Sequence, residues 1–347
     1  MLLRCRWAGA LAALGLAACQ PTAAPPKSDA AGVVNVYSGR HYDADAEIYR
    51  RFEAETGIRV RTLEAPGPQL LERLKAEGEA SAADLVITSD AGNLEQLVAA
   101  GLLQPVSSPT LEGAIPPRLR DDAGRWFGLS KRARVIVYDK SDPAAAAAKS
   151  YADLADPRFR GEVCVRSSTN IYNLSLLAEM IARDGAEAAK AWASGVRANM
   201  ARDPQGSDTD QIKAVAAGEC SLALVNHYYL VRMAKSADPS EREAAQKVGL
   251  AFPDQNAGGA HVNISGAGVA AHAPNRANAV RLLEYLVGPE AQSAFAQLNE
   301  EYPVLAGAPQ GEALTALGPF RESETPLAAL GEHQAEAQRL YDEVGWR

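Results

Sequence analysis

The stretch Val33-Val34-Asn35-Val36-Tyr37-Ser38 has the pattern of a buried strand, and helical spacing follows it over residues 44–56 up to Gly57. The same order then repeats along the chain, with extended patterns at 58–63 and 84–88 and helical patterns at 69–78 and 93–100. Strands that alternate with helices predict an α/β fold, in which a largely parallel sheet is covered by helices on both faces.

The central and C-terminal parts continue this alternation. Strand patterns recur at 133–138, 162–166, 222–226, 248–252, 262–264 and 266–270, and helical patterns at 171–183, 188–200, 208–217, 277–287, 289–300 and 327–344. The chain ends with helical periodicity over 327–344. A length of 347 residues predicts two domains, at about 100–200 residues each.

Composition narrows the range of functions. The chain is 47% apolar and 22% charged, which is enough apolar material for a real core. Its net charge is −8, and removal of the first 18 residues leaves 33 basic and 43 acidic side chains. This balance argues against nucleic acid as the main partner, because such binding requires a basic face.

The N-terminus has the features of an export signal. Arg4 and Arg6 precede an uncharged run of twelve residues at 7–18, which is too short to span a membrane. The run ends in Leu16-Ala17-Ala18-Cys19, which resembles a bacterial lipobox. We interpret 1–18 as a signal peptide and 19–32 as a lipidated N-terminus and tether, which places the protein in the periplasm or cell envelope, anchored at Cys19. The alternative is an ordinary signal peptide with a chance cysteine.

Two cysteines remain in the exported part. Cys164 and Cys220 each lie in or beside a short strand-like run, and neighbouring strands would bring them within bonding distance. Disulfides persist outside the cytosol, so we expect these two residues to form one, with two separate buried thiols as the alternative.

Candidate ligands follow the ends of predicted strands, where α/β proteins gather their ligands. His41-Tyr42 follows the first strand, Tyr228-Tyr229 follows the strand that ends at Asn226, and Tyr172 begins a helix. Phenolate is a hard, anionic oxygen donor that suits a hard trivalent cation. Adjacent tyrosines that leave a strand meet one ligand only if the chain bends there. Without further context, packing remains the ordinary role of each tyrosine.

Five segments together resemble the ferric-iron substrate-binding proteins of ABC importers, over residues 33–346. They are Val34-Asn35-Val36-Tyr37-Ser38-Gly39-Arg40-His41-Tyr42-Asp43, Gly128-Leu129-Ser130-Lys131-Arg132-Ala133-Arg134-Val135-Ile136-Val137-Tyr138, Ser167-Ser168-Thr169-Asn170-Ile171-Tyr172-Asn173, Asn226-His227-Tyr228-Tyr229 and His261-Val262-Asn263-Ile264-Ser265-Gly266-Ala267-Gly268.

This resemblance implies a two-lobed periplasmic-binding-protein fold, type II-like, with a ligand cleft between lobes that crossing strands join. Lobe one would comprise 33–133 plus 264–308, and lobe two 134–263 plus 309–347. It also implies that a monomer delivers its ligand to an ABC permease and its ATPase subunit.

The resemblance further implies that Fe³⁺ is held by Tyr42, Tyr172, Tyr228 and Tyr229, with His41 as a further candidate. Four phenolates around Fe³⁺ carry a formal charge of −1, which Arg132, or else Arg134, would offset from outside the ligand shell.

One branch of this family instead uses a histidine, a carboxylate, a tyrosine pair and an exogenous anion. Asp90 offers a carboxylate, but Tyr172 supplies an additional phenolate, so we favour the tyrosine-rich branch, which needs no carbonate or phosphate. Residues 166–170 would still suit an anion at a helix N-terminus.

Two other function classes compete with iron transport. The same fold would hold an oxyanion or small organic acid through Arg132, Arg134 and residues 167–170. An exported enzyme is not expected, because the sequence contains no HExxH, no GxSxG and no Cys/His nucleophile pair.

The lipobox-like segment generates a first prediction. Replacing Cys19 by Ser removes the acylated side chain, so the protein should stay unprocessed or become soluble instead of associating with membranes. Acyl chains retain a protein at a surface at about 0.8 kcal/mol per buried methylene. Intact-mass analysis of native protein checks this, and a mature N-terminus other than acylated Cys19 would show the interpretation to be wrong.

Overall fold

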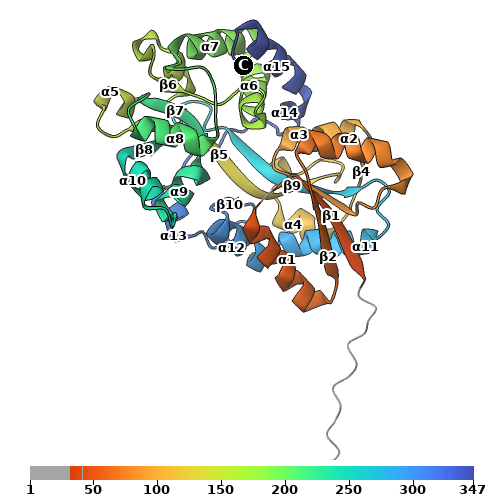
Figure 1. Cartoon of the computed structure of the whole chain (residues 1–347). Helices are drawn as coiled ribbons and strands as arrows, with labels where there is room; N and C mark the ends of the chain where they lie inside the picture. Colours follow the sequence, from red (N-terminus) through yellow and green to blue (C-terminus); the bar gives the residue numbers. More distant parts are fainter. Residues whose placement is uncertain (1–31, 41) are drawn as a thin grey trace, which may run out of the picture.

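The computed structural model describes residues 32–40 and 42–347. The signal peptide, Cys19, nearly all of the tether and His41 lie outside the described residues. Two lobes are visible in Figure 1, and two long strands, β5 (Phe127–Asp139) and β9 (Val262–Ala270), run between them. These strands pair with each other, so they form the connection between the lobes.

The strands form one sheet in the order β2-β1-β3-β9-β5-β7-β6, while β10 and β8 also pair with β5, and β4 with β9. The remaining strands are β1 (Val33–Ser38), β2 (Arg59–Glu64), β3 (Leu85–Thr88), β4 (Leu103–Gln104), β6 (Val163–Cys164), β7 (Leu222–Asn226), β8 (Val248–Ala251) and β10 (Tyr302–Pro303).

The expectation of a largely parallel sheet is wrong. Parallel pairing joins β1 to β2 and β3, and β6 to β7. The central pairs β3–β9, β9–β5 and β5–β7 are antiparallel. The physical reason is the connection itself, because the chain passes from the first lobe to the second along β5 and returns along β9, in the opposite direction.

Helices cover the sheet in both lobes (Figure 1). In the first lobe and its edge they are α1 (Asp43–Thr56), α2 (Gly67–Glu77), α3 (Ala91–Ala99), α4 (Pro109–Ala114), α11 (Arg276–Leu286) and α12 (Pro289–Leu298). The others are α5 (Pro143–Ala146), α6 (Ile171–Asp184), α7 (Ala186–Asn199), α8 (Asp208–Ala216), α9 (His227–Lys235), α10 (Pro239–Lys247), α13 (Glu312–Ala316), α14 (Ala328–Glu332) and α15 (Gln334–Glu343). Short 3₁₀ turns lie at Gly78–Ala80, Pro117–Leu119, Tyr151–Ala155 and Pro157–Phe159. Within the described part of the chain, no helix is both long enough and apolar enough to cross a bilayer.

The helical periodicity over 327–344 corresponds to two helices, because the chain breaks at His333 into α14 and α15. Leu330 of α14 packs into the first core, whereas Leu340 of α15 packs into the second. One straight helix cannot serve both cores. Gly331 permits a close approach of α14 to α3, since a Cβ there would meet the Glu95 Cβ at 2.3 Å.

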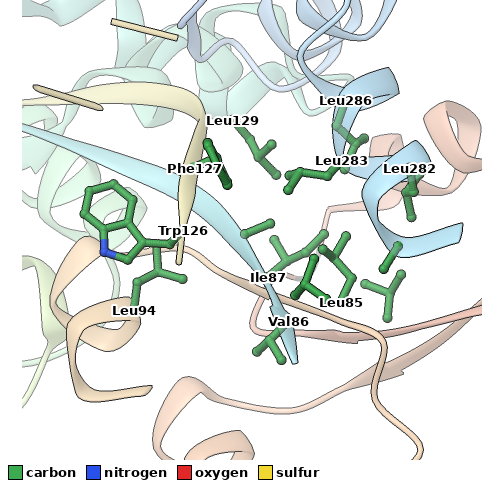
Figure 2. Packing of buried hydrophobic residues seen from close by; sticks show 14 of the residues in the cluster. Leu85, Val86, Ile87, Leu94, Trp126, Phe127, Leu129, Leu282, Leu283 and Leu286 are labelled. Atoms are coloured by element: carbon green, nitrogen blue, oxygen red, sulfur yellow. The ribbon is translucent and has the colours of Figure 1, made fainter. Parts of the chain in front are cut away.

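The hydrophobic core is divided in the same way as the lobes. One cluster contains residues of 34–129, 264–304 and 327–330, and Figure 2 shows its centre, where β3, α3 and α11 supply leucine, valine and isoleucine side chains around Phe127 and Leu129. Two further clusters contain residues of 133–262 and 337–346. The exact lobe boundaries remain a prediction.

Cys164 on β6 and Cys220, just before β7, are joined by a disulfide in the second lobe. β6 and β7 are neighbouring parallel strands, and the two Cα atoms lie 6.0 Å apart. The alternative of two separate buried thiols is therefore not what the structure contains.

Loss of this bridge should lower the stability of the second lobe. The bridge closes a loop with a sequence separation of 56, and a closure of that size is worth roughly 4 kcal/mol in the chain-entropy account. Thermal unfolding with and without reductant measures the effect. A Cys164→Ser/Cys220→Ser double variant is the control, because reductant should leave its melting temperature unchanged. Two free thiols in the non-reduced, unfolded wild type would contradict the prediction.

Candidate metal centre

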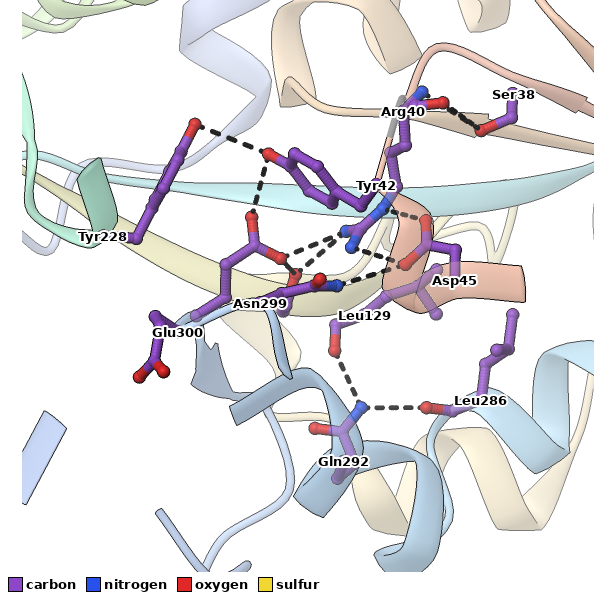
Figure 3. A network of polar contacts seen from close by, with 12 residues as sticks. Ser38, Arg40, Tyr42, Asp45, Leu129, Tyr228, Leu286, Gln292, Asn299 and Glu300 are labelled. Atoms are coloured by element: carbon purple, nitrogen blue, oxygen red, sulfur yellow. Dashed lines mark hydrogen bonds and ion pairs between the residues drawn. The ribbon is translucent and has the colours of Figure 1, made fainter. Parts of the chain in front are cut away.

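Tyrosine hydroxyls from both lobes converge between them. The Tyr42 hydroxyl lies 3.4 Å from that of Tyr228, and the Tyr228 hydroxyl lies 3.4 Å from that of Tyr172. Tyr229 stacks on Tyr228, with ring centres 4.4 Å apart. Figure 3 shows Tyr42 and Tyr228 reaching toward each other from different parts of the chain. All four tyrosines proposed from the sequence are thus brought together.

Each tyrosine is held at the start of a helix. Tyr42 is the N-cap residue of α1, Tyr172 is the second residue of α6, and Tyr228 and Tyr229 are the second and third residues of α9. The Asn170 side chain caps α6 by accepting a hydrogen bond from the Tyr172 backbone N–H at 3.1 Å. The N-terminal end of a helix is partially positive, so these positions favour an anionic phenolate.

The bend that the adjacent tyrosines require is present. β7 ends at Asn226 and α9 begins at His227 without an intervening loop, so Tyr228 and Tyr229 lie on the first turn of a helix. Within that turn the two rings stack, where an extended chain would direct them to opposite faces. The sequence patterns that we used did not predict α9 itself.

Burial controls the protonation of the tyrosines. Burial raises the pKa of Tyr228 well above its ordinary value, and the neighbouring phenols of Tyr172 and Tyr42 raise it further. Burial also raises the pKa of Tyr42, as does the nearby Glu301 carboxylate, and burial raises that of Tyr229. These three hydroxyls therefore keep their protons at neutral pH until a cation displaces them.

Arg132 and Arg134 lie beside Tyr172 and are both fully buried. Their guanidinium carbons are 5.1 and 5.8 Å from the Tyr172 ring centre. Arg132 pairs with Asp90 at 3.3 Å, and Arg134 pairs with Asp208 at 2.7 Å. Each arginine is thus also an ion-pair partner, and its positive charge lies within reach of the tyrosines.

The Asp90 carboxylate is occupied by hydrogen bonds to residues other than the four tyrosines. Both its oxygens accept from the Ser175 hydroxyl at 2.9 Å, and one accepts from the Asn263 amide at 2.8 Å. Asp90 also caps α3 through the Gly92 N–H. It fixes Arg132, and both of its carboxylate oxygens already accept hydrogen bonds from Ser175.

Two more arginines border the cluster. Arg166 belongs to the segment 166–170 that we considered for an anion, whereas the sequence interpretation did not single out Arg232. The guanidinium of Arg166 lies 5.6 Å from the Tyr172 ring centre, and that of Arg232 lies 4.6 Å from the ring centres of both Tyr42 and Tyr228. Arg232 occurs four residues after Tyr228 and three after Tyr229, and at these spacings helical side chains are neighbours on one face. Had α9 been predicted, this spacing would have indicated that Arg232 lies beside the tyrosine pair.

Glu301 and Arg40 were also missed. Glu301 is fully buried, and one of its carboxylate oxygens lies 3.5 Å from the Tyr42 hydroxyl. Its other oxygen lies 3.2 Å from Arg40 Nη1, and Arg40 also binds Asp45 at 2.8 Å. No local pattern in the sequence marks Glu301, because it approaches Tyr42 only through the tertiary fold.

His227 and His261, which lie in two of the segments singled out in the sequence, are both engaged by other protein groups. Both ring nitrogens of His227 are occupied, Nδ1 by the Ala133 N–H and Nε2 by the Glu300 carbonyl, and burial lowers its pKa to about 3. His261 pairs with Glu179. Across residues 32–40 and 42–347, no three His, Cys, Asp or Glu side chains are grouped to hold a metal ion. Among the described residues, the oxygen atoms that meet here are the phenol oxygens and, 3.5 Å from the Tyr42 hydroxyl, one carboxylate oxygen of Glu301.

Comparison with known proteins gives relatives of nearly full length. "Iron uptake protein A1" of Synechocystis sp. is 45% identical over 335 residues, covering 96% of this chain and 93% of that protein. The "Major ferric iron-binding protein" of Neisseria meningitidis is 28% identical, covering 96% and 97%.

Solved structures agree with this grouping. The Trichodesmium protein IdiA (FutA), solved in complex with iron and citrate ligands, superposes with a TM-score of 0.87 at 47% identity, covering 91% of this chain and 100% of that one. The ferric binding protein of Campylobacter jejuni superposes with a TM-score of 0.87 at 41% identity, covering 90% and 100%.

The family described as "Bacterial extracellular solute-binding protein" matches residues 47–320. That match spans most of the chain, and it agrees with the two-lobed fold and with the convergence of side chains from both lobes. The chain therefore belongs to the bacterial extracellular solute-binding proteins.

Proposed function

We propose that this protein captures Fe³⁺ between its lobes through the phenolates of Tyr42, Tyr172, Tyr228 and Tyr229 and delivers it to an ABC permease. The observation that carries the proposal is the convergence of tyrosine hydroxyls from the two lobes. His41 stays a candidate ligand, because it precedes Tyr42 in the sequence.

The oxygen spacing supports one shared ion. Small cations such as Mg²⁺ and Zn²⁺ lie about 2.0–2.2 Å from oxygen ligands, so two oxygens on one such ion are roughly 2.8–3.8 Å apart for angles between 90° and 120°. The hydroxyl separations of 3.4 Å fall in that interval. Little movement of the side chains is then needed when the ion enters.

The charges around the tyrosines favour a trivalent ion. Four phenolates and Fe³⁺ together carry a formal charge of −1. Arg132 and Arg134 adjoin Tyr172, and Arg232 adjoins Tyr42 and Tyr228, so positive charge lies close to the excess negative charge. Helix N-termini at all four tyrosines act in the same direction.

The cell-envelope role follows from the family and the N-terminal segment. Solute-binding proteins of ABC importers bring their ligand to a membrane permease and its ATPase subunit, and they are binding proteins and not enzymes. We propose that Cys19 carries a lipid anchor, that the protein acts as a monomer, and that the permease recognises the closed arrangement of the lobes.

An anion is the second candidate ligand, and buried arginine nitrogens favour it. Arg132 Nη1, Arg134 Nε and Arg166 Nε have no hydrogen-bond partner among the described residues. A carbonate, phosphate or small organic acid would satisfy them, either alone or beside the iron. A visible absorption band separates the two candidates, because Fe³⁺–phenolate charge transfer is coloured and an oxyanion is colourless.

Replacing single tyrosines by phenylalanine should weaken iron retention strongly. Tyr228→Phe removes one oxygen and leaves the ring stack intact, so it separates ligation from packing. Changes outside the ligand shell cost about 10–100-fold in metal affinity, so loss of a ligand should cost at least about 100-fold. Iron content and the visible spectrum of the four single variants measure this.

Two tyrosines serve as controls for these variants. Tyr302 stacks on His227, and its buried hydroxyl has no partner among the described residues. Tyr138 packs against the second-lobe core. Tyr302→Phe and Tyr138→Phe should keep full iron content and colour. Unchanged iron and colour in both Tyr228→Phe and Tyr229→Phe would instead favour the anion.

Iron affinity should fall as the pH is lowered. The pKa values of Tyr42, Tyr228 and Tyr229 are raised, so all three are protonated in the empty protein and each must release a proton when it binds. Each released proton weakens binding by about tenfold per unit decrease in pH. Proton release can be measured by calorimetry in buffers of different ionisation enthalpy. Release of one proton or none per Fe³⁺ would contradict the account.

A further inference from the structure

The segment at residues 299–301, which follows α12, makes contacts on both sides of the tyrosine cluster. We propose that this segment positions Tyr42 against the tyrosine pair of α9, with Glu301 as the positioning residue. The inference rests on the proposed function, and it names a part of the site that acts without touching the ion.

Asn299 makes the first of these contacts. Its carbonyl accepts two hydrogen bonds from Arg232 of α9, at 2.8 Å from Nη2 and 3.2 Å from Nε. Its side-chain amide donates to Asp45 at 3.1 Å, and Asp45 holds Arg40. Asn299 therefore links the helix that carries Tyr228 to the α1 end of the first lobe, where Tyr42 lies (Figure 3).

Glu300 makes the second contact. Its carbonyl accepts from His227 Nε2 at 3.0 Å, and its carboxylate lies 2.5 Å from Lys235 Nζ. Both partners belong to α9. Glu300 has φ of 56°, a left-handed conformation that glycine or asparagine usually adopts after a helix. At this position the chain has glutamate instead, and the Glu300 carboxylate pairs with Lys235 of α9, the helix that carries Tyr228 and Tyr229.

Glu301 makes the third contact, on the side of Tyr42. One carboxylate oxygen accepts from the Tyr42 hydroxyl at 3.5 Å. The other accepts from the Ser130 hydroxyl at 2.7 Å and lies 3.2 Å from Arg40 Nη1. The guanidinium of Arg40 in turn lies 4.6 Å from the Tyr42 ring centre. In the empty protein, where Tyr42 keeps its proton, Glu301 thus restrains the Tyr42 hydroxyl directly. A Tyr42 phenolate has no proton to donate, so in the iron-loaded protein Glu301 acts on Tyr42 through Arg40, which it holds against the Tyr42 ring.

Two of these successive residues, Asn299 and Glu300, therefore contact α9, and the third, Glu301, contacts Tyr42. Tyr42 comes from the first lobe and α9 from the second, so this segment sets the distance between phenol oxygens that must meet one ion. Groups outside the ligand shell that orient ligands change metal affinity about 10–100-fold when removed. Without Glu301, the four tyrosines remain present, but Tyr42 is no longer held in position.

The test uses Fe³⁺ itself, with the iron-loaded mature protein challenged by an excess of chelator. Glu301→Ala should speed iron dissociation at least about tenfold. Ser130→Ala removes one hydroxyl that holds Glu301, with almost no loss of volume, and should speed dissociation by about 2–10-fold. Both variants should shift the charge-transfer band, which a purely structural defect would not do.

Ser265→Ala is the matched control. Ser265 is the direct partner of Ser130 across β9, is equally buried, and its hydroxyl has no hydrogen-bond partner among the described residues. It should leave the dissociation rate and the band unchanged. The inference is overturned if both Glu301→Ala and Ser130→Ala behave like the wild type, or if Ser265→Ala changes the rate as much as Ser130→Ala does.

The outcomes also separate this inference from the proposed function. A wild-type protein that binds no Fe³⁺ would end the proposed function, whatever the variants do. A wild-type protein that binds coloured Fe³⁺, with unchanged kinetics in Ser130→Ala and Glu301→Ala, would end only the positioning role. If Glu301→Ala does not fold, Ser130→Ala decides alone, because its change is small enough to be accommodated.

Discussion

Ser130, Arg132 and Arg134 lie on one face of β5, and the centre of the molecule depends on the carboxylates that pair with them. Alternate residues of a strand share a face, so these three side chains all point to the same side of the connection between the lobes. All are buried, and a buried arginine without a counter-charge would cost several kcal/mol. Glu301 joins Ser130, Asp90 joins Arg132, and Asp208 joins Arg134.

These pairs draw in elements from distant parts of the sequence. Asp90 caps α3, Asp208 begins α8, and Glu301 follows α12. Because these carboxylates pair with the buried polar side chains of β5, the helices next to them are brought to the connection between the lobes. The helix N-termini that carry Tyr42, Tyr172 and the α9 pair face the same region, so positive charge surrounds the phenol oxygens. The same arrangement that stabilises the buried strand prepares a site for an anionic ligand set around a cation.

The sequence predicted much of this and failed at identifiable points. Period-2 and helical spacing located most strands and helices, and the resemblance to ferric-binding proteins is confirmed by the relatives found. Strand direction was predicted wrongly, because pairing between β5 and β9 depends on where the chain returns and not on local pattern. The break at His333 depends on two separate cores, which hydrophobic periodicity over 327–344 cannot distinguish.

The four tyrosines could be found from local sequence, whereas the residues that contact them could not. Tyr42, Tyr172, Tyr228 and Tyr229 were chosen from their places at strand and helix ends and from motif matches. Glu301 and Arg40 could not be chosen in that way, since Glu301 and Tyr42 are 259 positions apart in the sequence and only the tertiary fold brings them together. Residues that position a ligand leave a weaker trace in sequence than the ligands do.

The central claim is that one Fe³⁺ ion is held by phenolates from both lobes, and a crystal structure of the iron-loaded protein, with anomalous scattering at the iron edge, tests it most directly. The account predicts a single iron peak within about 2.2 Å of the phenol oxygens of Tyr42, Tyr172, Tyr228 and Tyr229. An iron peak elsewhere, or an anion on Arg132 and Arg134 with no iron between the tyrosines, would contradict it.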